Sequence, residues 1–180
     1  MPLVTTEAVV LKSIRWGEAD RIPTFFTIQL GKVRAIARGA RRMKSRFGSL
    51  LEPFMCVTLT IFDKRNYNLA SISHLSMLEN FSALRDDLER ISAAARMVLL
   101  VENITVERDP SPQLFYTLRA GLRTLLAVND YGLCILIFQI HLLGIAGFSA
   151  QLDCCASCGR FNMRLLNFSP SQGGLICMAC

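Results

Sequence analysis

Two pairs of cysteines near the end of the sequence constrain its fold more than any other feature. Cys155 and Cys158 form one C-x2-C pair, Cys177 and Cys180 form another, and 18 residues separate the pairs. Two residues between thiols let one tight turn direct both sulfurs at the same ion, and two such turns complete a tetrahedron of thiolates, the ligand set that zinc prefers. Gly159 follows the first pair, where such a turn often needs a residue without a side chain. The spacing predicts one zinc ion bound by Cys155, Cys158, Cys177 and Cys180.

A site closed by four thiolates has no position left for water or substrate, so the predicted ion is structural. Disulfides and unpaired buried thiols are the alternatives. The opening residues MPLVTTEAVVLKS show no secretory signal, and in a reducing compartment paired thiols more often bind metal than each other. Cys154 leaves an ambiguity, because it lies beside Cys155 and could replace it as a ligand. Cys56 and Cys134 lie in apolar runs and are predicted to be core residues.

The first 80 residues have the pattern of a small β-barrel. Short apolar or alternating runs are separated by turns, including the turn Trp16–Asp20 and the turn at residues 63–66, and a long basic loop (39–52) follows the third run. The predicted strands cover residues 6–14, 21–29, 32–38, 53–62 and 67–75. Five short strands of this kind fit a closed OB-fold barrel, which binds oligonucleotides, better than a sandwich.

The apolar period becomes helical after residue 80. We expect helices over Ser82–Asn103, from Ser111 as N-cap and Pro112 to about Val128, and over Tyr131–Phe148. The last of these is apolar, but Gln139, His141 and two glycines interrupt it, so it is predicted to be a buried core helix and not a membrane span. The predicted class is α+β, with an OB-fold domain (1–80), a helical domain (81–153) and a zinc-binding element (154–180).

Positive charge is concentrated in the N-terminal part of the chain. Residues 1–80 carry twelve Lys and Arg against six Asp and Glu, whereas residues 81–153 carry six against eight. Like charges on one loop repel each other, and Arg and Lys suit phosphates, so this part is predicted to bind nucleic acid. The alternative is a merely solvated loop. Phe26 and Phe47 could stack on bases, but aromatic residues at such positions are more often core. The predicted nucleic-acid contacts are Lys32, Arg34, Arg38, Arg41, Arg42, Lys44 and Arg46, with further cations at Lys12, Arg15, Arg21, Lys64 and Arg65.

No constellation of residues indicates catalysis. The chain has two histidines, of which His74 ends a predicted strand and His141 is predicted to be a core residue. The sequence lacks a phosphate-binding glycine loop, a nucleophile elbow and a zinc-deaminase signature. Glu18 and Asp20 alone are weak evidence for a nuclease, which magnesium-dependent cutting would reveal. We predict that the protein is not an enzyme.

Several motifs resemble the bacterial RecO family of recombination mediators. The matching segments are Val9–Leu11, Gly17–Arg21, Thr27, Gly31–Lys32, Gly39–Arg42, Lys44–Arg46 and Leu51–Phe54, together with LDCCASCG and FSPSQGGLICMAC around the cysteines. The resemblance covers essentially the whole chain. Members of the family usually continue past the second C-x-x-C into a further helix, whereas the sequence given stops at Cys180. Two alternatives are open: the sequence is a truncated piece of a longer chain, or the protein is a shortened member of the family.

The resemblance implies a bacterial, cytoplasmic, nucleoid-associated protein that binds single- and double-stranded DNA. Such a protein anneals complementary strands and, with RecR, helps RecA to displace single-strand-binding protein. In RecO-like proteins the helical domain captures the acidic C-terminal tail of single-strand-binding protein, and Arg119 and Arg123 are the cations available for it on the second helix. The alternative for these two arginines is that they face solvent. The alternative function is a simple OB-fold or zinc-ribbon module that binds RNA or regulates transcription.

Overall fold

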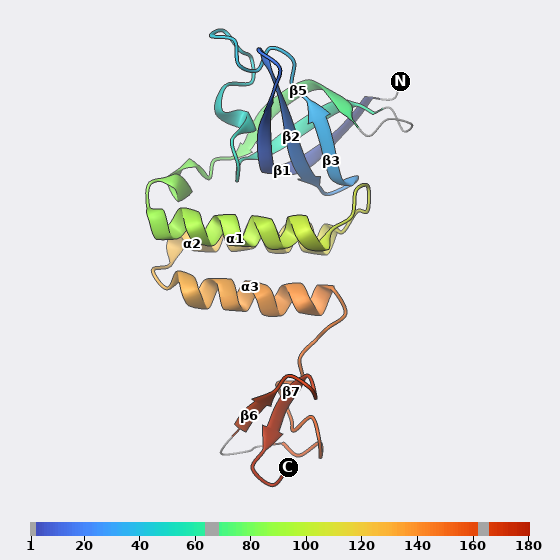
Figure 1. The fold of residues 1–180 in the computed structure, drawn as a ribbon, viewed down its shortest axis with the longest axis vertical. Helices are drawn as coiled ribbons and strands as arrows, with labels where there is room; N and C mark the ends of the chain where they lie inside the picture. The colour runs from blue at the N-terminus through green and yellow to red at the C-terminus, as the bar shows by residue number, and fades with distance from the viewer. Residues whose placement is uncertain (1–2, 64–68, 162–165) are drawn as a thin grey trace. The chain divides into compact units, whose positions relative to one another are not determined.

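The computed structural model describes residues 3–63, 69–161 and 166–180 (Figure 1). The chain forms two compact units, Met1–Ile135 and Leu136–Cys180. The first contains a β-barrel and two long helices. The second contains most of a third helix and a small cysteine-rich hairpin. The predicted division into three domains, with boundaries at residues 80 and 153, remains a prediction.

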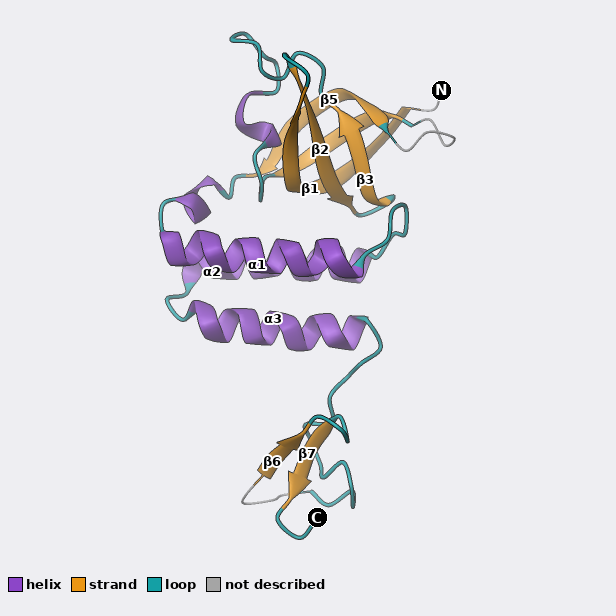
Figure 2. Ribbon diagram, viewed as in Figure 1, coloured by secondary structure: helices purple, strands orange, loops and turns teal. Residues whose placement is uncertain are grey.

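The N-terminal barrel has five strands, as the sequence predicts. They are β1 (Leu3–Trp16), β2 (Asp20–Thr27), β3 (Gly31–Ile36), β4 (Cys56–Phe62) and β5 (Ala70–Glu79), in the closed order β1-β2-β3-β5-β4 (Figure 2). β3 and β5 pair in parallel, and the other neighbours are antiparallel. Alternate apolar side chains fill the interior, among them Phe25, Val57 and Leu59, all fully buried. The predicted OB-fold barrel, and with it the α+β class, is confirmed.

The strand boundaries differ from the expected ones mainly at β1 and β5. β1 is longer than the predicted run, because it pairs with β4 from Leu3 to Val9 and with β2 from Ala8 to Trp16, with an irregularity between Val10 and Lys12. β5 begins at residue 70 and ends at residue 79. Most of the predicted turn at residues 63–66, including Lys64 and Arg65, lies outside the described residues.

The helical region begins with a short 3-10 turn, η2 (Ser82–Arg85), which is followed by α1 (Leu88–Ile104), α2 (Pro112–Ala127) and α3 (Tyr131–Ile145). The first helix was expected to run unbroken from Ser82. Instead Asp87 adopts an extended conformation and its carboxylate accepts a hydrogen bond from Arg90 N at 2.7 Å, so α1 starts with its own cap. α2 begins as predicted, with Ser111 as N-cap.

α3 is apolar on almost every side but only partly buried. Cys134, Ile135, Phe138 and Leu142 are buried, whereas other apolar residues along the same helix are 40–52% exposed. His141 is exposed, so its predicted core position is wrong; it falls on the helix surface beside the buried Leu142. None of the helices in the described part of the chain is both long and apolar enough to span a bilayer.

The connection between α1 and α2 is fixed to the barrel. Lys32 Nζ on β3 donates to the carbonyl oxygens of Glu102 and Thr105, 2.7 and 2.6 Å away at the C-terminal end of α1. Gly31, with φ +67°, lies so close to the Asp109 backbone that a β-carbon would overlap it. Arg108 reaches the buried Asp63 with two hydrogen bonds. These contacts join the barrel and the first two helices into one unit.

The cysteine-rich part of the second unit is built on one hairpin. Strands β6 (Leu166–Ser169) and β7 (Gly174–Cys177) are antiparallel. The segment before them pairs with β7, because Gln151 N bonds to Gly173 O and Leu175 N bonds to Gln151 O, both at 2.9 Å. These bonds place the first pair of cysteines beside the second.

Candidate metal centre and nucleic-acid interface

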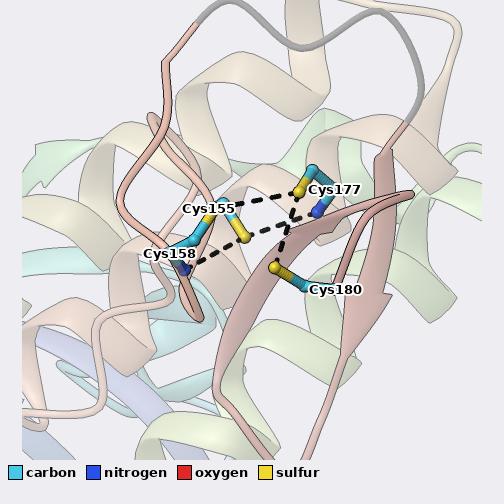
Figure 3. Close-up of side chains that lie close together, drawn as sticks. All are labelled: Cys155, Cys158, Cys177 and Cys180. Atoms are coloured by element: carbon cyan, nitrogen blue, oxygen red, sulfur yellow. Dashed lines mark hydrogen bonds between the residues drawn. The ribbon is translucent and has the colours of Figure 1, made fainter.

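The four cysteines of the two C-x2-C pairs meet at one point (Figure 3). Their sulfur atoms all lie within 4.8 Å of one another. Cys158 Sγ is 3.8 Å from Cys177 Sγ, which is 3.6 Å from Cys180 Sγ. A tetrahedral zinc ion with bonds of about 2.3 Å separates its sulfur ligands by about 3.8 Å. The geometry therefore fits a single ion bound by Cys155, Cys158, Cys177 and Cys180.

Backbone groups favour the charged form of the most buried ligand. Cys177 N and Cys158 N donate to Cys155 Sγ, at 3.4 and 3.5 Å. These bonds, the one from Cys177 first, lower the pKa of Cys155 to about 6. Gly159 follows with φ +71° and bonds its N–H to Cys155 O at 2.8 Å, as the turn requires. The turn thus favours the thiolate form of Cys155.

The structure distinguishes the ligand candidate Cys155 from its neighbour. Cys154 Sγ lies outside the group of four and accepts a hydrogen bond from Gln151 Nε2 at 2.9 Å. Cys56 and Cys134 are buried in the barrel and in α3, as predicted. Burial raises the pKa of Cys56 to about 12, so this thiol stays neutral.

The basic loop between β3 and η1 (Gly48–Leu51) is anchored at its base to the β1–β2 turn. Asp20 Oδ1 accepts a hydrogen bond from Gly39 N at 2.7 Å. Arg41 N donates to Ala19 O at 2.9 Å, and its guanidinium reaches the carbonyl oxygens of Gly17 and Glu18. Asp20 is therefore a loop anchor, a role that its position in the sequence did not indicate.

The cationic side chains of this loop differ in the contacts that they make. Arg38, Arg42 and Lys44 are exposed, and none of the described residues provides a hydrogen bond or an ion pair to their side chains. Arg46 is exposed as well, with its guanidinium 4.9 Å from the Phe47 ring centroid. Phe47 itself is buried, as is Phe26, so neither ring is open to a base. The loop thus presents cations whose charge is not neutralised within the described protein.

The two predicted contacts on β3 lie in a different environment. Lys32 is occupied by the carbonyl oxygens of α1. Arg34 pairs with Glu107 at 2.8 Å, and Lys12 on β1 pairs with Glu102. The acidic residues and carbonyls at the end of α1 therefore compensate the charge of this barrel face. The role of Lys32 and Arg34 in nucleic-acid binding remains a prediction.

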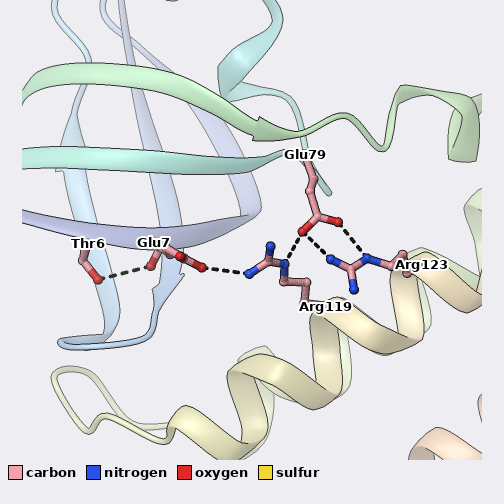
Figure 4. A network of polar contacts seen from close by, with 5 residues as sticks. All are labelled: Thr6, Glu7, Glu79, Arg119 and Arg123. Carbon is pink, nitrogen blue, oxygen red and sulfur yellow. Dashed lines mark hydrogen bonds and ion pairs between the residues drawn. The ribbon is translucent and has the colours of Figure 1, made fainter.

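Arg119 and Arg123 on α2 bind carboxylates of the barrel (Figure 4). Arg119 bonds to Glu79 and, at 2.8 Å, to Glu7, and its side chain is 18% exposed. Arg123 is 59% exposed and bonds to Glu79 at 2.8 and 2.9 Å. Burial raises the pKa of Glu79, but the hydrogen bonds from Arg123 and Arg119 outweigh it and hold the pKa below its ordinary value. The network fastens α2 to the barrel.

The Glu79 network gives a pH-dependent contribution to stability. Because the pKa of Glu79 is lower in the folded state, its contribution is fully present above about pH 4.5 and is lost as the pH falls through the folded pKa. We expect Glu79→Gln to reduce the free energy of unfolding by about 2 kcal/mol at pH 7 and by much less near pH 3. Urea unfolding of both proteins at the two pH values measures this. A difference independent of pH would show that the Glu79 charge is not involved.

The fold and the cysteine cluster together define a class: an OB-fold barrel protein with a basic loop and an element whose four cysteines could hold a metal ion. Family comparison refines this class. Residues 1–81 match the family described as "Recombination protein O N terminal", and residues 85–180 match "Recombination protein O C terminal".

Individual relatives agree with the family match. The chain is 39% identical to "DNA repair protein RecO" of Nocardioides sp. strain JS614, over 99% of this chain and 74% of the relative. It is 36% identical to the protein of the same name from Thermoanaerobacter sp. strain X514, over 100% of this chain and 72% of the relative. It is 34% identical to the protein of the same name from Syntrophus aciditrophicus, over 97% of this chain and 68% of the relative. The chain belongs to the RecO family, as the sequence motifs predict.

Proposed function

We propose that this chain is a non-catalytic mediator of recombination and DNA repair that binds single- and double-stranded DNA. Membership of the RecO family supports a role in recombination and repair. The observation that carries the proposal is the loop on the barrel with the exposed cations Arg38, Arg42 and Lys44. Exposed cations on an OB-fold can bind the phosphate backbone of a nucleic acid independently of its base sequence.

The proposed activities and partners rest on what the resemblance to the RecO family implies. The protein anneals complementary strands and, with RecR, helps to load RecA onto DNA coated by single-strand-binding protein, in the bacterial cytoplasm at the nucleoid. The proposed structural ion is zinc, because four thiolates at these distances suit it.

The tail of single-strand-binding protein is the proposed ligand of Arg119 and Arg123. Both arginines already bind Glu79, so an acidic tail would have to compete with that carboxylate. Arg123 is the more accessible of the two. A labelled tail peptide should therefore lose more affinity for Arg123→Ala than for Arg119→Ala.

The DNA surface can be tested through its charge. If about five phosphates are neutralised, the affinity for single-stranded DNA should fall with salt at a log–log slope of about −3.5. Changing Arg38, Arg42 and Lys44 together to Ala should weaken binding to all sequences alike and flatten the slope, as measured by fluorescence anisotropy; Arg41, which anchors the loop, is left in place. Arg96→Ala is the control, since Arg96 is an exposed cation of the helical region and none of the described residues binds its side chain.

Annealing distinguishes a mediator from a simple binding module. The wild-type protein should anneal complementary strands coated with single-strand-binding protein, and the loop variant should do so more slowly. A module that binds nucleic acid without acting as a mediator would be blocked by the coating. Loop variants with unchanged affinity and slope would mean that the loop is only solvated.

A further inference from the structure

The chain's single tryptophan lies exposed at the tip of the β1–β2 hairpin. Trp16 is the last residue of β1 and is 56% exposed. Tryptophan is highly buried on average in folded proteins, so an open indole calls for an explanation. Phe26 and Phe47, the aromatic residues near the basic region, are 0% and 2% exposed and cannot meet a ligand. Within the described part of this barrel end, Trp16 is the ring that a ligand can reach.

The pairing of the hairpin places this ring on the same face as the basic loop. Trp16 lies directly opposite Asp20 in the antiparallel register. Residues opposite each other in such a pair project from the same face of the ribbon. The Asp20 carboxylate is bound to Gly39 N in the loop, so the loop covers the face from which Trp16 projects. Figure 1 shows the hairpin tip and the loop at one end of the barrel.

The positive charges near Trp16 favour a ligand that carries negative charge. Arg41 is bonded to the carbonyl oxygens of Gly17 and Glu18, the two residues that follow Trp16. Arg42 and Lys44 continue along the same loop, exposed and without an acidic partner among the described residues. An open aromatic ring beside cations that lack counter-charges is the combination that binds single-stranded nucleic acid, whose bases stack while its phosphates meet the cations. A protein partner would need acidic groups for all these cations as well as an apolar contact.

We propose that Trp16 is a stacking platform for an unpaired base of single-stranded DNA whose phosphates lie on the loop cations. The inference rests on the proposed DNA-binding function and gives it a preference for single strands. In a duplex each base is already stacked between its neighbours and paired, so duplex DNA uses the loop cations but not the indole. Ile14, two residues earlier on the same face and 51% exposed, extends the apolar surface but cannot stack as a ring does.

Intrinsic fluorescence tests the proposal on the intact protein, because Trp16 is the only tryptophan. Titration with an unlabelled oligodeoxynucleotide should quench the Trp16 emission, with the same Kd that anisotropy gives for labelled DNA. A duplex of the same sequence should bind with much less quenching. Emission unchanged at saturating single-stranded DNA would overturn the proposal.

Substitution separates stacking from charge. Trp16→Ala should weaken binding to single strands about tenfold, leave the salt slope unchanged and alter duplex affinity little. Trp16→Phe should restore most of the affinity, and Ile14→Ala should have a small effect. Thermal unfolding of each variant verifies that the barrel is folded.

The outcomes distinguish this inference from the function on which it rests. If the wild-type protein binds no single-stranded DNA, the proposed function fails. If it binds with the expected salt slope and Trp16→Ala binds equally well, only the stacking role is wrong. If Ile14→Ala and Trp16→Ala lose affinity equally, the face is merely apolar and the indole has no special part.

Discussion

Replacing Cys158 by Ser is expected to abolish metal binding and unfold the cysteine-rich hairpin. The four thiolates converge within 4.8 Å, and the hairpin that carries them has only two short strands of its own. The free energy of binding for structural zinc, about 10–16 kcal/mol, then becomes folding free energy of the element. Purified wild-type protein should contain about one zinc per chain, and the variant almost none. Elemental analysis gives the metal content, and limited proteolysis of residues 151–180 reports the unfolding.

Cys154→Ser is the matched control for this prediction. Cys154 precedes the predicted ligand Cys155 but its sulfur lies outside the group of four, so metal content and protease resistance should stay as in the wild type. The Cys158→Ser variant should retain some DNA binding, because the proposed contacts lie on the barrel. Wild-type protein that carries no zinc when prepared without chelators or oxidants would disprove the zinc assignment.

Removing the guanidinium of Arg108 should destabilise the barrel unit strongly, because it breaks an ion pair with a buried carboxylate. Arg108 binds Asp63 through two bonds of 2.7 and 2.9 Å, and the Asp63 side chain is only 5% exposed. Arg108→Ala leaves a buried carboxylate without its partner, which costs about 3 kcal/mol of the free energy of unfolding. The substitution keeps a β-carbon at the same backbone angle, φ 61°, so it changes the ion pair and not the backbone strain.

Two comparisons test whether burial of the Asp63 carboxylate causes the expected loss of stability in Arg108→Ala. Asp63→Ala should cost less than Arg108→Ala, because Arg108 is 33% exposed and water can solvate its charge once the partner is gone. Arg34→Ala breaks a pair in which both side chains are more than 40% exposed, so its effect should stay below about 1 kcal/mol. Chemical unfolding measures all three. Equal effects for Arg108→Ala and Arg34→Ala would contradict the explanation from burial.

The sequence predicts the features of this protein that depend on local pattern. The cysteine spacing predicted which four thiols come together, and the structure places those four within 4.8 Å of one another, because two tight turns leave little choice of geometry. Alternation and turn residues specified five strands, and Ser111 with Pro112 specified the start of α2. The break before α1 was missed because the periodicity of Leu84, Leu88 and Ile91 continues across it, while the Asp87 cap acts through one hydrogen bond.

Tertiary partners were beyond the reach of the sequence pattern. Lys32 and Arg34 are cations like those of the loop, and nothing near them in the sequence shows that they have partners some 70 residues later. Backbone carbonyl oxygens at the end of α1 bind Lys32, and Glu107 pairs with Arg34. Arg119 and Arg123 have the spacing of a solvent-exposed pair, yet they bind Glu79 across the interface with the barrel. Charge composition therefore locates the basic region but does not identify which of its members are free.

The anchoring of the basic loop has a kinetic consequence. Asp20 and Arg41 fix the loop base to the β1–β2 turn by bonds of 2.7 and 2.9 Å, so the base of the loop is ordered before the proposed DNA ligand binds. A preordered surface of this kind forms productive encounters at a rate governed by diffusion and long-range attraction, which steer the polyanion towards it. In the proposed DNA complex, the effect of salt should consequently fall mainly on the association rate constant.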